Sequence, residues 1–509
     1  MIRTLTGLAL AGGLFSLAPS LSVAQEAILL TPAEAASDSA PALVRALQEV
    51  QPDRISADLH FIASDAMAGR DTPSKELEVA AHFLRSRLQK LEFAPGAGES
   101  YFYEYPLDST ALDLEGCSAG WSSAAGERKL TLAKDYYFGA RRVYESMEST
   151  GEIISVGEGT SDDFDGVELN GRWAMMLDRE GGRISKPRRA LRDTGAAGLI
   201  VVQSSDYSGE PLVDRFGGER FEDLLKGSVR FPRGEGESGG RPMIPIVYLE
   251  RSQTVELLAA CAGAKDDPTW FPKAGALTGV TFSEKRELAG EGGQVIVKNV
   301  CGLWPGSDPE LSKEVIIVSA HYDHVGMQRG EIHNGADDNG SGTSGVLAVA
   351  DALHAYGPMK RSVMLIWVSG EEKGLWGSKA WANNPMLPEG HRAVADINID
   401  MIGRNDPNEL FITPTRDHKQ FNPISEAAMR LSPLEGFPKL ESADDYYHRS
   451  DQKEFARLGI PVAFLFAGIH EDYHQPSDTP DKIDYEKLSR VVRLVVRLLD
   501  EMQTMNLDL

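Results

Sequence analysis

The chain has 509 residues, more than one small hydrophobic core can organise, so we expect at least two domains. Apolar residues make up 42% of the chain and charged residues 25%, which is ordinary for a soluble globular protein. The formal net charge of −24 argues against nucleic acid or an anionic membrane surface as the main partner.

Residues 1–24 have the pattern of a secretory signal peptide. Arg3 precedes an apolar stretch at 5–17, and the small residues Ser22 and Ala24 indicate cleavage after Ala24. The apolar stretch is short for a membrane anchor, and no later segment approaches the roughly 18 apolar residues of a membrane span. We therefore expect an exported protein, periplasmic or extracellular, without membrane attachment in its mature form.

The chain contains three cysteines, Cys117, Cys261 and Cys301. An oxidising compartment would permit one disulfide among them and leave one thiol over, and the sequence does not select the pair. The cysteines lie far apart and lack C-x-x-C spacing. We expect structural or buried side chains rather than a zinc site.

Two segments precede the first change in composition. Residues 25–40 are rich in Ala, Ser and Pro, which predicts a leader or linker. Residues 41–134 are expected to be the N-terminal part of the main domain. Within them, 76–91 has apolar residues every three or four positions, which predicts an amphipathic helix lying across a sheet face.

Residues 135–285 are expected to form a separately folded, β-rich insertion. Short strand-like runs alternate with Gly and acidic residues, and a long polar loop covers 204–241. No segment gathers His, Cys or carboxylates at metal-ligand spacing. The stretches GRWAMMLDRE (171–180) and GAAGLIVVQ (195–203), with a helix near 188–193 between them, resemble the protease-associated domain, a β-rich module often inserted into secreted peptidases.

Residues 286–509 have the pattern of an α/β fold with a mostly parallel, mixed central sheet and helices on both faces. Apolar runs at 315–320, 363–368 and 393–399 have the length of buried strands, and helical patterns alternate with them. In such sheets, ligands bind outside the carboxyl ends of the strands. The polar residues expected at that edge are His321, Asp338, Glu371, Glu372, Asp400 and His474.

Two imidazoles and three carboxylates at this edge form a ligand set for two metal ions. One bridging carboxylate would give two three-ligand sites with open positions, from His321, Asp338, Glu372, Asp400 and His474. This mixture of N and O ligands suits two Zn²⁺, with Mn²⁺ or Co²⁺ as substitutes. Two such ions would polarise a carbonyl and generate hydroxide at neutral pH. Adjacent side chains on a turn point in different directions, so Glu372 would bind metal while Glu371 would face the bridging water as general base.

Each of these residues also has an ordinary structural explanation. A single His or Asp at a strand end is usually a cap, GADDNG alone is a turn, and Glu371-Glu372 alone is a solvated pair. The GSG at 340–342 resembles a phosphate loop, but no Lys follows it. Four other histidines compete as ligands, and we expect them behind the ligands or at the surface: His324, His333, His448 and His470. Convergence on one edge favours the metal site.

Five ordered motifs resemble those of the di-zinc aminopeptidases of the MH clan, which include secreted bacterial leucyl aminopeptidases. They are AHYDHVG, GADDNGSG, SGEEKGLWGS, NIDMIG and DYHQPSDT, and an N-terminal stretch containing AGRDTPSKE also fits. The resemblance implies one zinc on His321 and Asp400, the other on Glu372 and His474, and Asp338 bridging both. It also implies that Glu371 is the base and that Asp323 fixes the tautomer of His321.

The implied activity is that of an exported metallo-aminopeptidase, which removes N-terminal residues from peptides by a two-zinc-activated water. Tyr447 would donate to the developing oxyanion or simply pack as an aromatic. Asp444 and Asp445 would pair with the substrate ammonium or remain solvated loop residues.

Other functions remain open on the sequence alone. The same scaffold would serve a carboxypeptidase or a glutaminyl-cyclase-like enzyme, and a different class is a non-catalytic peptide-binding protein with structural metals. An unliganded Glu371 argues against the last, since a structural site has no use for a base. The sequence leaves the side-chain preference, native metal, oligomeric state and role of the insertion undetermined.

Overall fold

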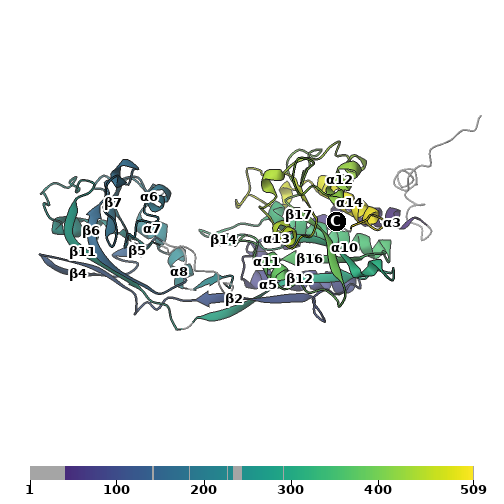
Figure 1. The fold of residues 1–509 in the computed structure, drawn as a ribbon, viewed down its shortest axis with the longest axis horizontal. Helices are drawn as coiled ribbons and strands as arrows, with labels where there is room; N and C mark the ends of the chain where they lie inside the picture. The colour runs from purple at the N-terminus through teal and green to yellow at the C-terminus, as the bar shows by residue number, and fades with distance from the viewer. Residues whose placement is uncertain are drawn as a thin grey trace, which may run out of the picture. The chain divides into compact units, whose positions relative to one another are not determined.

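The computed structural model describes residues 40–139, 143–182, 184–225, 227–232, 244–290 and 292–507. The predicted signal peptide lies outside these residues, as does the predicted linker apart from Ala40. The chain divides into two compact units (Figure 1). The first contains the chain up to Tyr103, Asn299–Gly326 and His333 onward, and the second contains Glu104–Lys298 and Met327–Ile332.

The first unit is built on a mixed sheet whose central strands are parallel. The strand order is β19-β18-β20-β17-β13-β16-β12, with the short β1 (Ala94–Pro95) paired to β12. The bounds are β12 (Gly293–Trp304), β13 (Glu314–His321), β16 (Ser362–Val368), β17 (Arg392–Asp400), β18 (Phe411–Thr413), β19 (Glu441–Ser442) and β20 (Val462–Phe466). Strands β16, β13, β17 and β20 are parallel neighbours. Strand β12 pairs antiparallel with β16, and β18 pairs antiparallel with β20.

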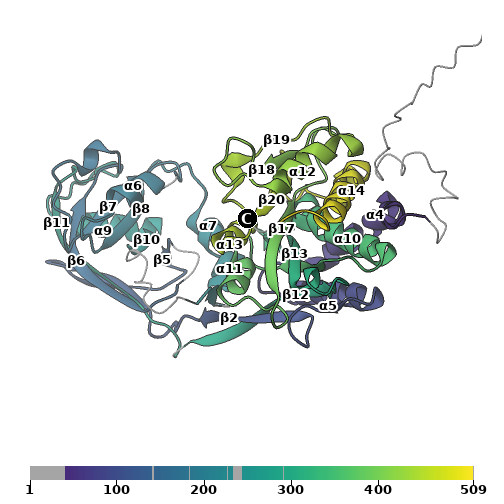
Figure 2. The same ribbon diagram turned by 45° about the vertical axis from the view of Figure 1, so that its right-hand side comes forward.

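Helices cover both faces of this sheet. One face packs against α3 (Ala42–Glu49), α4 (Pro52–Ile62), α5 (Lys75–Lys90), α10 (Gly342–Tyr356), α12 (Pro423–Leu431) and α14 (Tyr485–Met502), which share one core with alternate strand residues. The other face carries α11 (Trp376–Asn383) and α13 (Gln452–Arg457) (Figure 2). The predicted fold class, the predicted buried strands and the helix predicted at 76–91 are confirmed.

The second unit contains an eight-stranded sheet in the order β4-β3-β11-β6-β7-β8-β10-β5. Its strands are β3 (Ser118–Ser123), β4 (Gly126–Leu130), β5 (Tyr136–Phe138), β6 (Met147–Ser155), β7 (Trp173–Asp178), β8 (Gly198–Gln203), β10 (Ile246–Leu249) and β11 (Leu277–Arg286). Strand β2 (Phe102–Thr110) leads into the unit and pairs with β9 (Ser228–Arg230). The helices are α6 (Ser185–Ala190), α7 (Leu212–Phe216), α8 (Glu219–Leu225) and α9 (Arg251–Ala260).

The second unit is wider than the insertion predicted at 135–285. Strands β3 and β4 precede residue 135 in the chain, yet β3 pairs with β11 and β4 pairs with β3. These short strands carry many polar residues, and β4 is mostly exposed, so the sequence has no apolar pattern that would predict them. The unit also contains a parallel core, β6-β7-β8-β10, that composition alone does not distinguish.

Two further sequence expectations concern the cysteines and the absence of a membrane span. All three cysteines are free thiols, so the disulfide that an oxidising compartment would permit is not formed. Cys261 and Cys301 are buried, as expected, and Cys117 is partly exposed. Within the described ranges, the helices are all too short or too polar to cross a membrane.

Candidate metal centre

Four neighbouring parallel strands bring the predicted site residues to one sheet edge. His321 is the last residue of β13, and Asp400 is the last residue of β17. Glu371 and Glu372 follow directly after β16, and His474 lies on the loop after β20. Asp338 lies in the segment Ala336–Ser341, which leads into α10 and in which Asp338 and Asn339 have non-helical backbone angles. The edge therefore gathers side chains from segments far apart in the sequence.

Two groups of side chains have the arrangement of metal ligands. The first ligand group consists of His321, Asp338 and Asp400, and the second consists of His324, Asp338, Glu372 and His474. Within each group, the ligand atoms lie within 4.8 Å of one another. All five residues predicted as ligands belong to these groups.

The distances between ligand atoms fit bound divalent ions. Ligands at 2.0–2.1 Å from a tetrahedral zinc lie about 3.3 Å from one another. His321 Nε2 is 3.4 Å from Asp338 Oδ1 and 3.4 Å from Asp400 Oδ1. His474 Nε2 is 3.0 Å from Asp338 Oδ2 and 3.1 Å from Glu372 Oε2. Asp338 therefore turns one oxygen toward each group, as a bridging ligand does.

Hydrogen bonding also distinguishes these atoms. Buried polar atoms in proteins nearly always have a hydrogen-bond partner. Seven atoms of the two groups are buried and have none among the described residues: His321 Nε2, His324 Nδ1, His324 Nε2, Asp338 Oδ2, Glu372 Oε1, Asp400 Oδ1 and His474 Nε2. Because they converge from separate elements, bound cations are the partners that fit them best.

The metal-free charges of the site are strongly coupled. Burial opposes the charged form of His474, but the carboxylates of Asp338 and Glu372 outweigh it and raise the pKa of the imidazole to about 10. Burial likewise opposes ionisation of Asp338, yet the surrounding imidazoles hold the pKa of its carboxyl well below the usual range. Burial raises the pKa of Asp400. Protons thus occupy positions that a cation would take.

Glu371 belongs to neither ligand group. Its backbone N–H donates to Asp323 Oδ1 at 3.2 Å. Burial raises the pKa of the Glu371 carboxyl well above the usual range in the metal-free protein, and Asp451, Glu372 and Asp400 act in the same direction. A carboxyl with a raised pKa next to a metal centre has the properties of a general acid–base group.

Asp323 lies fully buried behind His321. Its carboxylate Oδ1 is 3.8 Å from His321 Nδ1, whereas its own backbone carbonyl oxygen is closer, at 3.1 Å. The carbonyl therefore accepts the hydrogen bond that fixes the imidazole tautomer, and the carboxylate holds the backbone of Glu371. Burial raises the pKa of Asp323 to about 6.

The segment predicted to contact substrate is engaged in other contacts. The carboxylate of Asp444 accepts hydrogen bonds from Thr413 Oγ1 at 2.7 Å and from the Thr415 N–H at 2.9 Å. Its oxygens therefore hold the loop after β18, which disfavours the expected pairing with a substrate ammonium. Asp445 is exposed. Tyr447 is buried, and its ring packs 4.3 Å from that of His418, between centroids.

The four competing histidines differ in whether they belong to a ligand group. His448 is exposed, His333 Nδ1 contacts the His474 carbonyl at 3.1 Å, and His470 Nε2 lies 3.2 Å from Asp337 Oδ2. None of these three belongs to a ligand group among the described residues. His324 does, contrary to the expectation that it lies behind the ligands or at the surface.

Sequence reasoning missed Arg70, which organises the loops of the site. Its side chain is fully buried and donates only to backbone carbonyls: Ile62 (2.7 Å), Tyr322 (2.9 Å), Asn334 (2.8 Å) and Gly335 (3.0 Å). Burial lowers its pKa to about 10. These carbonyls flank His321 and Asp338, so the guanidinium holds the two loops that carry ligands.

The neighbours of Arg70 reinforce this anchoring. Thr72 Oγ1 accepts the Gly370 N–H at 3.1 Å, just before the glutamate pair. Gly69 has φ of +73°, and a Cβ there would lie 2.4 Å from the His333 carbonyl oxygen. The signal in the sequence was the AGRDT stretch, which has the composition of an ordinary loop but belongs to the N-terminal stretch that also fits the family resemblance.

Ser450 is a second residue that the sequence did not single out. Its hydroxyl donates to Asp400 Oδ2 at 2.8 Å and accepts from Asn398 Nδ2 at 3.1 Å. The contact directs the other oxygen of Asp400 toward His321. Next in the chain, Asp451 is fully buried, and burial raises its pKa to about 7.

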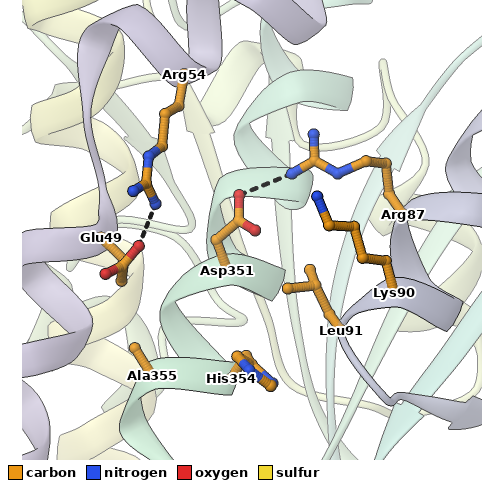
Figure 3. A pocket seen from close by; sticks show the side chains of 8 residues that line it. All are labelled: Glu49, Arg54, Arg87, Lys90, Leu91, Asp351, His354 and Ala355. Carbon is orange, nitrogen blue, oxygen red and sulfur yellow. Dashed lines mark hydrogen bonds and ion pairs between the residues drawn. The ribbon is translucent and has the colours of Figure 1, made fainter.

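A pocket of about 240 Å³ lies elsewhere in the first unit, and it is lined by Glu49, Arg54, Arg87, Lys90, Leu91, Asp351, His354 and Ala355 (Figure 3). Arg87 Nη2 is 2.9 Å from Asp351 Oδ2, and Arg54 pairs with Glu49. Both carboxylates of the pocket are thus neutralised by arginines from neighbouring helices. This pocket lacks the unpaired acceptors that mark the metal centre.

Part of the chain is similar in sequence to known peptidases. The sequence model of peptidase family M28 matches residues 299–499. A probable leucine aminopeptidase of Arthroderma otae is 29% identical over 209 residues, which cover 39% of this chain and 57% of that relative. Aminopeptidase YwaD of Bacillus subtilis is 31% identical over 196 residues, 37% of this chain and 41% of that relative. The chain thus matches about half the length of these curated relatives.

Solved structures extend the likeness in fold beyond the matched region. An aminopeptidase from Aneurinibacillus sp. strain AM-1 has a TM-score of 0.53 at 22% identity and covers 90% of this chain and 95% of its own. A zinc aminopeptidase from Bacillus subtilis has a TM-score of 0.54 at 20% identity, with 90% and 97% covered. At these identities the comparison concerns the fold.

Proposed function

We propose that the chain is a metallo-aminopeptidase that hydrolyses N-terminal residues from peptides, because residues 299–499 match the sequence model of peptidase family M28. The observation that carries this proposal is the pair of ligand groups joined by the two oxygens of Asp338. The names of the relatives, leucine aminopeptidase and aminopeptidase, support the same reaction.

Two divalent ions bound to these groups, Zn²⁺ or its substitutes Mn²⁺ and Co²⁺, would polarise the peptide carbonyl and make the attacking water more acidic. The first ion would rest on His321 and Asp400, the second on Glu372 and His474, and Asp338 would serve both. Two imidazoles and three carboxylates give the donor set that zinc prefers. The unpartnered buried atoms of the groups support this assignment.

Glu371 would act as the general base. Its carboxyl is outside both ligand groups but electrostatically coupled to their residues, and burial raises its pKa well above the usual range in the metal-free protein, so it holds a proton more strongly than an exposed carboxyl does. It would take a proton from the attacking water and deliver it to the leaving amine. Asp323 would act as a positioning residue, since it binds the backbone of Glu371 next to His321.

The assay that tests this proposal compares amino-acyl chromogenic substrates with their N-acetylated versions, with and without chelator. We expect cleavage of the free-amine substrates at least tenfold faster than of the blocked ones, and loss of activity on chelation. Release of C-terminal residues first would indicate a carboxypeptidase, and cyclisation of N-terminal glutamine would indicate a cyclase. Metal binding without hydrolysis of any peptide would indicate a binding protein.

Export and domain organisation are proposals as well. We expect cleavage after Ala24, and N-terminal mass spectrometry of the secreted protein tests it. A mature chain that begins at Met1 would contradict export by this signal. The insertion is proposed to be a protease-associated-like module, supported by the sequence resemblance within the contiguous part of the second unit, Glu104–Lys298. Independent cooperative unfolding of that fragment would support this division.

A further inference from the structure

The second ligand group contains one more imidazole than the five-ligand arrangement requires. His324 Nδ1 lies 2.9 Å from Glu372 Oε1 and 3.7 Å from Asp338 Oδ2. These distances bracket the separation of about 3.3 Å expected between ligands of one zinc ion. The imidazole of His324 faces the ring of His474 across the group, with centroids 5.5 Å apart and planes at 70°.

The nitrogens of His324 are not committed elsewhere in the described structure. The side chain is fully buried, and neither Nδ1 nor Nε2 has a hydrogen-bond partner of good geometry among the described residues. A buried neutral imidazole normally uses at least one nitrogen in a hydrogen bond. The nitrogen nearest the carboxylates, Nδ1, points to the same place as the other ligand atoms of the group.

The backbone fixes the orientation of this ring. The His324 N–H donates to the Arg70 carbonyl at 3.1 Å. Gly335, with φ of +59°, lies against the ring, and a Cβ at this position would be 2.4 Å from His324 Cγ. A residue other than glycine would displace the imidazole, so the turn before Asp338 and the ring of His324 are built to fit each other.

We propose that His324 is a direct metal ligand of the second group, an inference that rests on the proposed metal-dependent function of this site. The second ion would then have four protein ligands, His324, Asp338, Glu372 and His474, one more than the first ion. The first group has three protein ligands and keeps an open position for water and substrate. The two ions would therefore differ in role: one held tightly and one exchangeable beside the reacting groups.

This assignment predicts unequal affinities. The four-ligand group should fill first and release its ion last, and the three-ligand group should be the one emptied by brief treatment with a chelator. Zinc titration of the metal-free full-length chain should resolve two binding steps. His324→Gln should weaken the tighter step by more than the roughly 10–100-fold typical for loss of a residue behind a ligand, because it removes a ligand itself.

The deciding measurement is X-ray absorption at the zinc edge on the full-length protein loaded with two equivalents of zinc. We expect three imidazole ligands in total over the two ions, from His321, His324 and His474. His324→Gln should reduce the total to two. His470→Gln is the matched control, a buried histidine in neither ligand group, and should leave both the imidazole total and the affinities unchanged.

A total of two imidazoles in the unmutated protein would overturn the inference without need of any variant. Weaker zinc binding by His324→Gln with an unchanged imidazole total would also overturn it, because the ring would then act through Glu372. These readouts need no peptide substrate. An inactive protein with three imidazole ligands would contradict the proposed activity but support the assignment of His324. An active protein with two imidazole ligands would support the activity but contradict that assignment.

Discussion

The two units both contain parallel strands that end in an acidic residue, and they use it in opposite ways. In the second unit, β7 ends at Asp178, whose Oδ1 accepts the N–H groups of the following turn, including Gly181 at 3.0 Å. In the first unit, β17 ends at Asp400, whose Oδ1 is buried with no hydrogen-bond partner in the described structure. The sequence pattern is the same, but only the second case leaves an acceptor for a cation.

The buried charges of the units show the same contrast. In the second unit, Glu284 and Arg286 pair with each other along β11, and the guanidinium lies 4.3 Å from the Phe138 ring centroid. In the first unit, carboxylates and imidazoles from five segments meet without completing each other's hydrogen bonds. Glu284 Oε2 is also buried without a partner among the described residues, but it stands alone, so the site is marked by the convergence of several such acceptors from different elements.

The largest effect should come from the glutamate pair. Glu371→Gln should retain both metal ions and lose about 10²–10⁴-fold in kcat, the range for removal of a general base. Glu372→Gln should instead lose the ion of the second ligand group. Metal analysis and kcat on the same preparations measure both. If the two variants lose metal and activity alike, Glu371 is a ligand and the assignment of the base fails.

Arg70→Met should destabilise the first unit by about 3–4 kcal/mol, since each of the four lost hydrogen bonds contributes ~1 kcal/mol. Hydrogen exchange followed by mass spectrometry resolves the two units, and protection in the second should not change. Arg45→Met is the matched control: Arg45 also donates to backbone carbonyls, among them Ala355, but at a partly buried position. Equal losses in both variants would contradict the special role of Arg70.

The protonation of His474 predicts a pH-dependent zinc affinity. In the metal-free protein its pKa is about 10, above that of a free imidazole, so zinc must displace a proton at neutral pH. Affinity should rise by up to about tenfold per pH unit between pH 7 and 9. Calorimetry in buffers of different ionisation enthalpy counts the released protons. Binding without proton release at pH 7 would contradict the raised pKa.

The raised pKa of His474 also makes the stability of the metal-free protein depend on pH. A histidine with a raised folded-state pKa stabilises the fold fully below its unfolded pKa of about 6.5, and the contribution is lost as the pH rises through the folded value. The metal-free first unit should therefore lose stability between about pH 6.5 and 10. The zinc-loaded protein should not show this loss, because the ion replaces the proton.

The smallest effect concerns the comparison of strand ends itself. Asp178→Ala should cost the second unit about 1–2 kcal/mol, the value of a buried acceptor lost from its turn, and leave metal content and kcat unchanged. Asp400→Ala should remove the ion of the first ligand group. Denaturant unfolding and metal analysis of both variants provide the test. A change of metal content in the first variant would mean that the two strand ends are not distinct.

The central strands of the first unit are predictable from sequence because helices cover both of their faces, which leaves nearly continuous apolar runs such as 315–320. The proximity of the five predicted ligands is predictable for a related reason, since parallel strands end at one edge. Strands β3 and β4 are not predictable from sequence, because their exposed sides carry no apolar pattern.

Other features depend on contacts that no local pattern encodes. Arg70 meets Tyr322, which is 252 positions later in the chain. The role of His324 depends on the path of the loop after β13 and on the space left by Gly335. Asp444 looks available in sequence, and only the neighbouring Thr413 and Thr415 reveal that its oxygens are occupied.

The separation between Arg70 and its acceptors has a consequence for folding during synthesis. The loops that Arg70 binds are translated only after the whole of residues 104–298. That stretch is contiguous, and its two ends meet within the unit itself: the Asp113 N–H donates to the Glu287 carbonyl at 2.9 Å, and the Ala289 N–H to the Ala111 carbonyl at 2.8 Å. Once folded, it shortens the effective loop between Arg70 and Tyr322 from 252 residues to about 75, which lowers the entropy cost of joining the two halves of the first unit.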